Sequence, residues 1–180
     1  SITGLIGPNG SGKTTLMNLI NGLYKPNAGV IYFKGKNITR SKPHKIANLG
    51  VGRLFQRPRI FKRLTVTQNL LLPVIPLWKK GGMVERAGKL LKSADLIRVK
   101  DKLAGNVSHG QQRLTEICRA LMADPDLILL DEPFSGLHPE MIKKMVLIIK
   151  EFRSLKKTFL IVSHNTVSYT HLRAHETVLD

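Results

Sequence analysis

The sequence predicts an α/β domain with a mainly parallel sheet, a small antiparallel β portion and a helical insertion. Strand patterns alternate with helix patterns along most of the 180 residues, an order typical of parallel sheets joined by helices. Residues 127–130 are apolar at every position, as a strand covered on both faces should be. The hydrophobic content of 42% is sufficient for one domain with a sizeable core.

The chain opens on a short apolar strand at residues 2–6, which leads into a glycine-rich loop and then into a helix. Leu16, Met17, Leu19 and Ile20 give this helix an apolar side. The loop is therefore expected between the carboxyl end of a strand and the amino end of a helix.

Turn-forming residues at 26–29 separate this unit from two short strands within 30–38. These strands are predicted to pair about a turn at Gly35 and to form the small antiparallel portion. Residues 50–55 are predicted to form the next strand, which ends at Gln56.

The helical insertion is predicted over about residues 58–107, with a helical pattern from 65 to about 104. Apolar residues recur there at three- and four-residue spacing, as one side of a helix requires. They are Val84, Ala87, Leu90, Leu91 and Ala94.

The last third of the chain returns to alternation. A helix is predicted at 111–122, then the strand at 127–130, a helix from Pro139 and a strand at 158–162. The single cysteine, Cys118, lies on the apolar side of the first of these helices and is predicted to be a small core residue. One cysteine excludes a disulfide framework.

The glycine-rich loop matches G-x-x-x-x-G-K-[ST], the pattern of a phosphate-binding loop. Its three glycines let the backbone turn N–H groups toward phosphate oxygens, and the helix N-terminus adds partial positive charge. Lys13 is predicted to reach the β- and γ-phosphates, and Thr14 to offer its hydroxyl to Mg²⁺. The residues predicted to bind ATP are Gly7, Pro8, Asn9, Gly10, Ser11, Gly12, Lys13, Thr14 and Thr15.

The strand at 127–130 ends in Asp131-Glu132-Pro133. Asp131 is expected to face the phosphate loop, where a Mg²⁺-binding aspartate lies in phosphate-loop enzymes. Glu132 is the candidate that orients and polarises the attacking water. The alternative is that these residues only stop the strand and cap the next helix. His164 follows the last strand at the same sheet edge, where a lone histidine is more often structural.

The net charge of +17 comes from 29 basic and 12 acidic residues. Such a charge favours an anionic partner, whether nucleotide, nucleic acid or an acidic membrane surface, although a solvated surface alone also explains it. No basic stretch has the interleaved aromatic residues that stack single-stranded bases. No segment approaches the ~20 apolar residues of a membrane-spanning helix.

Taken in order, these motifs resemble the ATP-binding cassette of ABC transporters over residues 1 to about 165. The phosphate loop matches the Walker A motif, and Gln56 matches the Q-loop glutamine. Residues 127–132 match the Walker B strand with its catalytic glutamate, and His164 matches the switch histidine. The signature motif of the family is matched by Ser108, His109, Gly110 and Gln111.

The resemblance implies the ABC ATPase fold, a P-loop NTPase, and Mg²⁺-dependent hydrolysis of ATP. Glu132, His164 and Gln56 would be the catalytic residues. Mg²⁺ would be held by Thr14, Gln56 and Asp131.

The resemblance also implies partners. A second ATP-binding subunit, identical or different, would form a head-to-tail dimer in which Ser108 and the Gly110 N–H contact the partner's γ-phosphate. Gln56 would relay the nucleotide state to transmembrane permease subunits, with a substrate-binding protein in an importer. The location implied is peripheral, on the cytoplasmic face of a membrane such as the bacterial inner membrane.

Residues 52–61, 108–113 and 132–137 look like those of the importer ATPases for branched-chain amino acids. The ATPase of lipopolysaccharide export has similar stretches and is an alternative. A nucleic-acid-associated ABC ATPase of repair or translation is another, motivated by the charge, but the segment between Lys13 and Ser108 is too short for the long coiled coil of repair members. A third alternative is an inactive fragment that serves only in interactions.

The chain departs from the family at several places. His109 stands where most members have glycine, and a histidine there would be strained if the position needed positive φ. His138 stands where many members have an aspartate that communicates between the two sites. No adenine-stacking residue can be assigned, so a fragment is expected, and residues 166–180 are predicted to be foreign to the domain.

Overall fold

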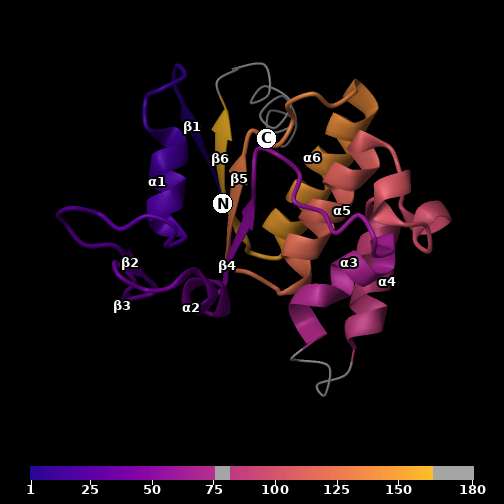
Figure 1. Cartoon of the computed structure of the whole chain (residues 1–180), viewed down its shortest axis with the longest axis horizontal. Coiled ribbons are helices and arrows are strands. Elements are labelled where there is room, and N and C mark those ends of the chain that lie inside the picture. The colour runs from indigo at the N-terminus through magenta and orange to yellow at the C-terminus, as the bar shows by residue number, and fades with distance from the viewer. Residues whose placement is uncertain (76–81, 164–180) are drawn as a thin grey trace, which may run out of the picture.

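The computed structural model describes residues 1–75 and 82–163. At its centre lies a four-stranded parallel sheet in the order β1-β6-β5-β4 (Figure 1). Its strands are β1 (Ile2–Ile6), β4 (Val51–Leu54), β5 (Leu127–Asp131) and β6 (Thr158–Ser163). The predicted parallel α/β sheet is confirmed. Because β6 lies between β1 and β5, the strands that precede the phosphate loop and Asp131 are not direct neighbours.

The predicted antiparallel portion is a two-stranded hairpin of β2 (Tyr32–Phe33) and β3 (Lys36–Asn37). Its turn consists of Lys34 and Gly35, which both have positive φ angles of 50° and 72°. This backbone is the one that two-residue hairpins favour.

Helices cover both faces of the sheet, with α1 on one side and α5 and α6 on the other (Figure 1). They are α1 (Lys13–Ile20), α2 (Pro43–Asn48), α3 (Val66–Leu71), α4 (Met83–Ser93), α5 (His109–Met122) and α6 (Pro139–Ser154), with 3-10 turns η2 (Ile97–Val99) and η3 (Ala104–Asn106). The helices α3 and α4 and both 3-10 turns fall inside the predicted helical insertion. The boundaries of that insertion and of the domain stay predictions, and the tail from residue 166 lies outside the described residues.

Strand β5 separates two apolar cores, which explains why every one of its early residues is apolar. Ile128 and Leu130 pack with the core that contains α3 to α6. Leu129 packs on the other face with Met17 of α1 and Ile46 of α2. All three β5 side chains are fully buried, and burial of each contributes about 1.5–3 kcal/mol.

The predicted apolar side of α4 is confirmed at Ala87, Leu90 and Leu91, which are at most 3% exposed. The prediction is wrong for Val84, which is 63% exposed. Val84 lies in the first turn after the Gly82 N-cap, on the side of the helix that faces away from the core, and its neighbour Met83 packs against the core instead.

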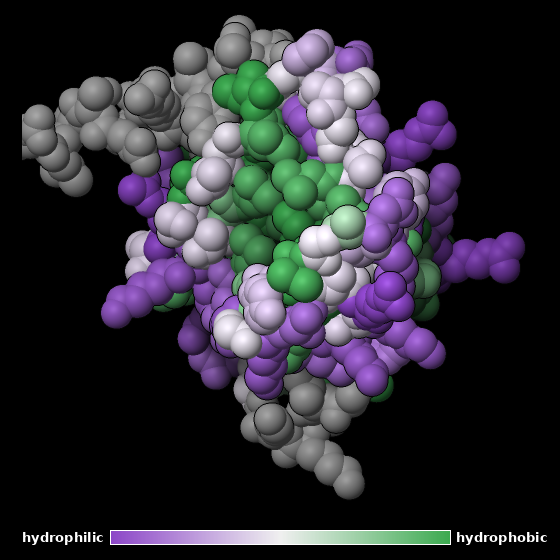
Figure 2. Space-filling model, turned by 90° about the vertical axis from the view of Figure 1, so that its left-hand side faces the viewer, coloured by the Kyte–Doolittle hydropathy of each residue, from purple (hydrophilic) through white to green (hydrophobic). Residues whose placement is uncertain are grey.

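The surface is divided by chemistry. The side that carries α1 and the hairpin has an apolar area bordered by polar residues (Figure 2). Exposed apolar residues of β1, α1 and the segment before the hairpin include Ile6, Leu16 and Val30. Positive charge gathers in the early part of the chain, because none of the 12 acidic residues precedes Glu85. We call the exposed residues of β3 and α2 with their connection the basic lobe: Lys36, Arg40, Lys42, His44 and Lys45. In the described part of the chain, none of the helices could serve as a membrane-spanning segment.

Candidate functional site

The phosphate loop connects β1 to α1 and uses its glycines in two ways. Gly10 and Gly12 have φ angles of 83° and 87°, a conformation that side chains with a Cβ rarely adopt. Gly7 does not have a positive φ, but a Cβ there would lie 3.0 Å from Oγ of Ser11, so the serine side chain would have to move. The loop thereby turns back on itself before the first residue of α1.

The ammonium group of Lys13 lies inside this turn. Its Nζ donates hydrogen bonds to the carbonyl oxygens of Gly7 at 2.7 Å and Pro8 at 2.6 Å, and to Oγ of Ser11 at 3.3 Å. A full positive charge therefore lies beside the N-terminus of α1, whose dipole is positive at the same end. Together they make a site for an anion.

Asp131 at the end of β5 reaches the first turn of α1. Oγ1 of Thr14 donates to Oδ1 of Asp131 over 3.5 Å, a long hydrogen bond. The other carboxylate oxygen, Oδ2, accepts from Nη2 of Arg53 at 3.2 Å. Arg53 pairs in register with Leu129 across β4 and β5, so it lies on the same face of the sheet as Asp131, one repeat earlier.

The Arg53–Asp131 pair is buried, with side chains 6% and 3% exposed. Burial lowers the pKa of Arg53, and the attraction of Asp131 opposes that effect. The guanidinium carbon lies 4.6 Å from the centroid of the Phe55 ring, and that of Arg59 lies 3.9 Å from the same centroid. No role was predicted for Arg53 from the sequence. The feature that could have indicated one is its position as the single charged residue in an otherwise apolar strand.

These parts surround one cavity of about 280 Å³. It brings together residues of the phosphate loop, the Q-loop glutamine and both acidic residues that follow β5. The lining consists of Asn9, Gly10, Gly12, Lys13, Thr14, Thr15, Gln56, Asp131, Glu132 and Val162.

Glu132 has an unusual backbone. Its φ is +46°, and the left-handed region costs a non-glycine residue about 1–3 kcal/mol. Its N–H donates to the carbonyl of Val162 at 3.0 Å, and its Oε2 accepts from Oγ of Ser163 at 3.4 Å. Since strain of this kind persists only where the surroundings impose it, the turn holds the Glu132 carboxylate at the cavity wall. Ser163 is a contact that the sequence interpretation missed.

The sequence model of the ABC transporter family matches residues 1–135. The chain belongs to the ABC transporter family. Membership implies that the cassette binds and hydrolyses ATP.

Named relatives agree with the family. The cassette is 40% identical over 177 residues to the "Probable branched-chain amino acid transport ATP-binding protein LivG" of Archaeoglobus fulgidus. This match covers 91% of the cassette and 69% of the relative. It is 34% identical over 181 residues to the "High-affinity branched-chain amino acid transport ATP-binding protein LivG" of Escherichia coli K12. That match covers 91% of the cassette and 71% of the relative.

Solved structures confirm the predicted ABC ATPase fold. A nucleotide-free ATP-binding cassette from an ABC transporter has a TM-score of 0.81 at 37% identity, and the match covers 95% of this cassette and 73% of that chain. A dimeric cassette in a post-hydrolysis state, bound to ADP and Pi, has a TM-score of 0.80 at 30% identity, with coverage of 94% and 77%.

The predicted signature residues of the cassette lie at the start of α5. Ser108 is the N-cap, and its Oγ accepts from the N–H of Gln111 at 3.3 Å while Oε1 of Gln111 accepts from the N–H of Ser108 at 3.0 Å. His109 is the first helical residue, and its φ is not positive, so the strain considered for histidine does not arise. A Cβ on Gly110 would lie 2.6 Å from Cγ of Met141 in α6, so glycine is needed there for close packing.

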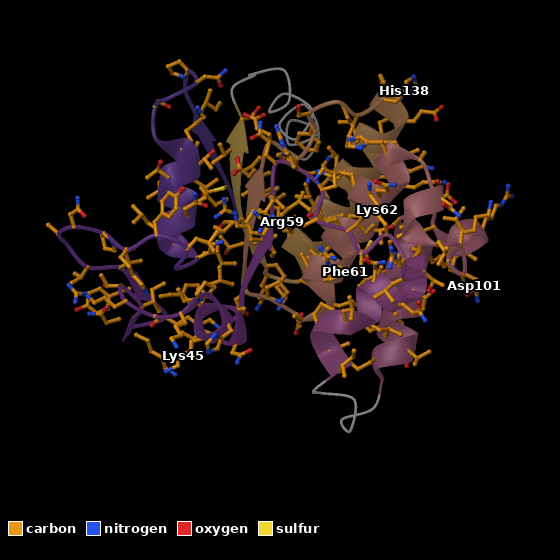
Figure 3. All side chains as sticks on the ribbon, viewed as in Figure 1. Lys45, Arg59, Phe61, Lys62, Asp101 and His138 are labelled. Carbon is orange, nitrogen blue, oxygen red and sulfur yellow. The ribbon has the colours of Figure 1, made fainter. Side chains whose placement is uncertain are left out.

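None of these four signature residues lines the cavity, although all four are among the described residues. The structure thus places the signature apart from the cassette's own phosphate loop. His138 is the exposed N-cap residue of α6 (Figure 3). The predicted catalytic residue His164 lies outside the described residues.

The residues at the cavity fit the oxygen ligands that Mg²⁺ prefers. Thr14 and Asp131 place a hydroxyl and a carboxylate oxygen 3.5 Å apart, and Gln56 lines the same cavity. Among the residues with described positions, no group of three or more His, Cys, Asp or Glu could hold a metal by itself. A cation here would therefore have few protein ligands, as is usual for Mg²⁺ that is also bound to phosphates.

Proposed function

We propose that this chain is the Mg²⁺-dependent ATP-hydrolysing subunit of an ABC importer for branched-chain amino acids. The observation that carries the proposal is the convergence of Lys13, Thr14, Gln56, Asp131 and Glu132 on one cavity. The cargo is supported by the relatives' names, at 40% and 34% identity. Transmembrane permease subunits, and a substrate-binding protein outside, would complete the transporter, with the cassette peripheral on the cytoplasmic face.

The chemistry follows from the positions of the side chains. Lys13 and the N–H groups of the loop would bind the phosphates, because charge and dipole are positive there. Thr14, Asp131 and Gln56 would hold Mg²⁺, which supplies charge neutralisation on the phosphates when bound. Glu132 would orient the attacking water and accept its proton.

The signature would act on a second cassette. Ser108 and the N–H of Gly110 lie at the amino end of α5, where a helix attracts anions, yet they are absent from the lining of their own cavity. A head-to-tail dimer would bring them to the ATP of the partner. His164 keeps its predicted role as a catalytic residue.

The catalytic role of Glu132 is tested by Glu132→Gln. We expect ATP binding within about twofold of wild type and hydrolysis reduced by two to four orders of magnitude, because the amide cannot accept the proton. Binding is measured with a fluorescent ATP analogue and hydrolysis by phosphate release. Glu140→Gln, an exposed substitution in the first turn of α6, is the control and should change neither. Undiminished hydrolysis in Glu132→Gln refutes the assignment.

The cargo is tested separately, with the cassette assembled on its permeases in vesicles. We expect ATP-dependent uptake of leucine, isoleucine or valine that is lost in Glu132→Gln. Movement of lipopolysaccharide instead would support the export-type alternative. Steeply salt-dependent binding to duplex DNA would support the nucleic-acid alternative. Either result would overturn the cargo and leave the ATPase assignment intact.

A further inference from the structure

Helix α5 carries three charged residues that contact the segments after β4 and β5. Arg113 and Glu116 form an ion pair of 2.9 Å in which both side chains are 2% exposed. Arg119 lies 4.0 Å from the same carboxylate and is 16% exposed. Charges this deeply buried need partners, and the partners identify what the cluster does.

Arg113 distributes its donors between two functional segments. Its Nη1 donates to the carbonyl of Phe55, the residue before Gln56, and to Oε2 of Glu116 at 2.9 Å. Its Nη2 donates to the carbonyls of Asp131 at 3.2 Å and Glu132 at 3.3 Å. Its Nε donates to the carbonyl of Pro133 at 3.5 Å. One guanidinium thus links the end of β4 to the turn after β5.

Glu116 and Arg119 also bind the Q-loop segment through the backbone of Arg59. Oε1 of Glu116 accepts from the N–H of Arg59 at 3.0 Å, and Nη2 of Arg119 donates to the carbonyl of Arg59. The segment from Phe55 to Arg59, which contains Gln56, is therefore fixed to α5 at both of its ends. In Figure 3, Arg59 lies between the sheet and the helical part of the molecule, beside α5.

We propose that Arg113 is a positioning residue that couples the Q-loop to the Glu132 turn through α5. Because the planar fork of a guanidinium presents five donors in fixed directions, a displacement of either segment is passed to the other. The helix that carries the signature at its amino end would thus set the positions of Gln56 and Glu132 together. The catalytic importance of Gln56 and Glu132 rests on the proposed function. The mechanical coupling between their two segments does not depend on that function.

The coupling is tested by hydrogen exchange of backbone amides in the full 180-residue chain, without nucleotide. Arg113→Met removes every donor, and Arg113→Lys keeps the charge but replaces the fork by a single ammonium. Arg86→Met is the matched control, since Arg86 also bridges backbone and carboxylate, at Leu121 and Asp124, away from the ATP site. Thermal unfolding of each variant reports general stability.

We expect Arg113→Met to accelerate exchange about tenfold in both 54–59 and 131–135, while Arg86→Met changes both by less than about twofold. Arg113→Lys should lose protection in at least one of the two segments, because one ammonium cannot reach both. Binding of a fluorescent ATP analogue should change less than about threefold, since Arg113 does not line the cavity.

Two results would overturn the proposal. One is equal acceleration in Arg86→Met and Arg113→Met, which would mean a purely structural role. The other is acceleration of a single segment in Arg113→Met, which would mean that no coupling exists. If Arg113→Met does not fold, Arg113→Lys decides, and full protection of both segments in that variant refutes the coupling. None of these readouts uses ATP turnover, so the outcome is independent of the Glu132→Gln test.

Discussion

At the residue scale, the buried Arg53–Asp131 pair fixes which carboxylate oxygen of Asp131 is available at the cavity. Arg53 occupies Oδ2, so that Oδ1 is the oxygen that faces Thr14. The arrangement has a cost, because Nε and Nη1 of Arg53 are buried without hydrogen-bond partners among the described residues. A pair of this kind does not by itself stabilise a fold, but removal of one partner leaves a buried, uncompensated charge.

Arg53→Met should therefore destabilise the chain by about 3 kcal/mol, at the lower end for a broken buried pair because the two unpaired nitrogens are removed as well. Under the proposed function the folded state binds Mg²⁺ at Asp131 and the unfolded state does not, so MgCl₂ should recover more stability in the variant than in wild type. Urea unfolding followed by circular dichroism, with and without MgCl₂, measures both effects. Equal responses of the two proteins to MgCl₂ would contradict the prediction.

Cys118 gives a pH dependence. The thiol is fully buried, and burial raises its pKa from 9.0 to about 12. The folded state therefore retains a proton that the unfolded state loses, and the stability contributed by the neutral thiol is complete below pH 9 and is lost progressively as the pH rises toward 12. The expected slope is about 1.4 kcal/mol per pH unit in that window. Comparison with Cys118→Ala isolates it, and parallel stability curves for the two proteins would refute it.

At the element scale, two helical glycines have opposite consequences. In Gly110 of α5 a Cβ would meet the Met141 side chain at 2.6 Å, whereas in Gly88 of α4 it would meet nothing within 4 Å. Alanine has the higher helix propensity at both positions. Only the packing environment distinguishes them.

Gly110→Ala should destabilise the chain by about 1 kcal/mol, because overpacking of α5 against α6 outweighs the gain in propensity. Gly88→Ala should stabilise it by about 0.5–1 kcal/mol. Chemical denaturation of both variants measures the difference. In a Met141→Ala background Gly110→Ala should become neutral or stabilising, and a persistent penalty there would show that packing against Met141 is not the cause.

Most of the elements could be predicted from the sequence because their apolar periodicity is strong. Helix α2 was missed, since it is short and buries only Ile46. The position of β6 between β1 and β5 could not be predicted, because periodicity carries no information on strand order. The burial of Arg113 and Glu116 was not predicted, since charged residues in a helix usually face solvent. Their spacing of three residues and their opposite charges could have indicated an ion pair within the helix.

At the scale of the whole molecule, the phosphate loop, the Q-loop and the Walker B turn lie on the same edge of the sheet because three parallel strands end there. The motif order predicted this meeting, and the structure brings the residues to one cavity. What motifs cannot predict is the charge balance of the surface. Basic residues outnumber acidic residues by 29 to 12, which gives a net charge of +17.

Self-repulsion at this charge should make the stability depend on salt. Screening reduces repulsion between exposed charges over about 10 Å at 0.1 M ionic strength. The melting temperature should therefore rise by several degrees between low and moderate NaCl concentrations, and equal osmolality of sucrose serves as the control. A melting temperature that falls with NaCl would show that attractive surface pairs dominate instead.

The uneven distribution of charge has a further consequence for motion. The basic lobe lies on one side of the molecule (Figure 1), and every acidic residue comes from Glu85 onward. The molecule therefore has a permanent electric dipole moment in addition to its net charge. Near an anionic surface the field should exert a torque as well as a pull, so we expect the chain to turn β3 and α2 toward that surface before any specific contact forms.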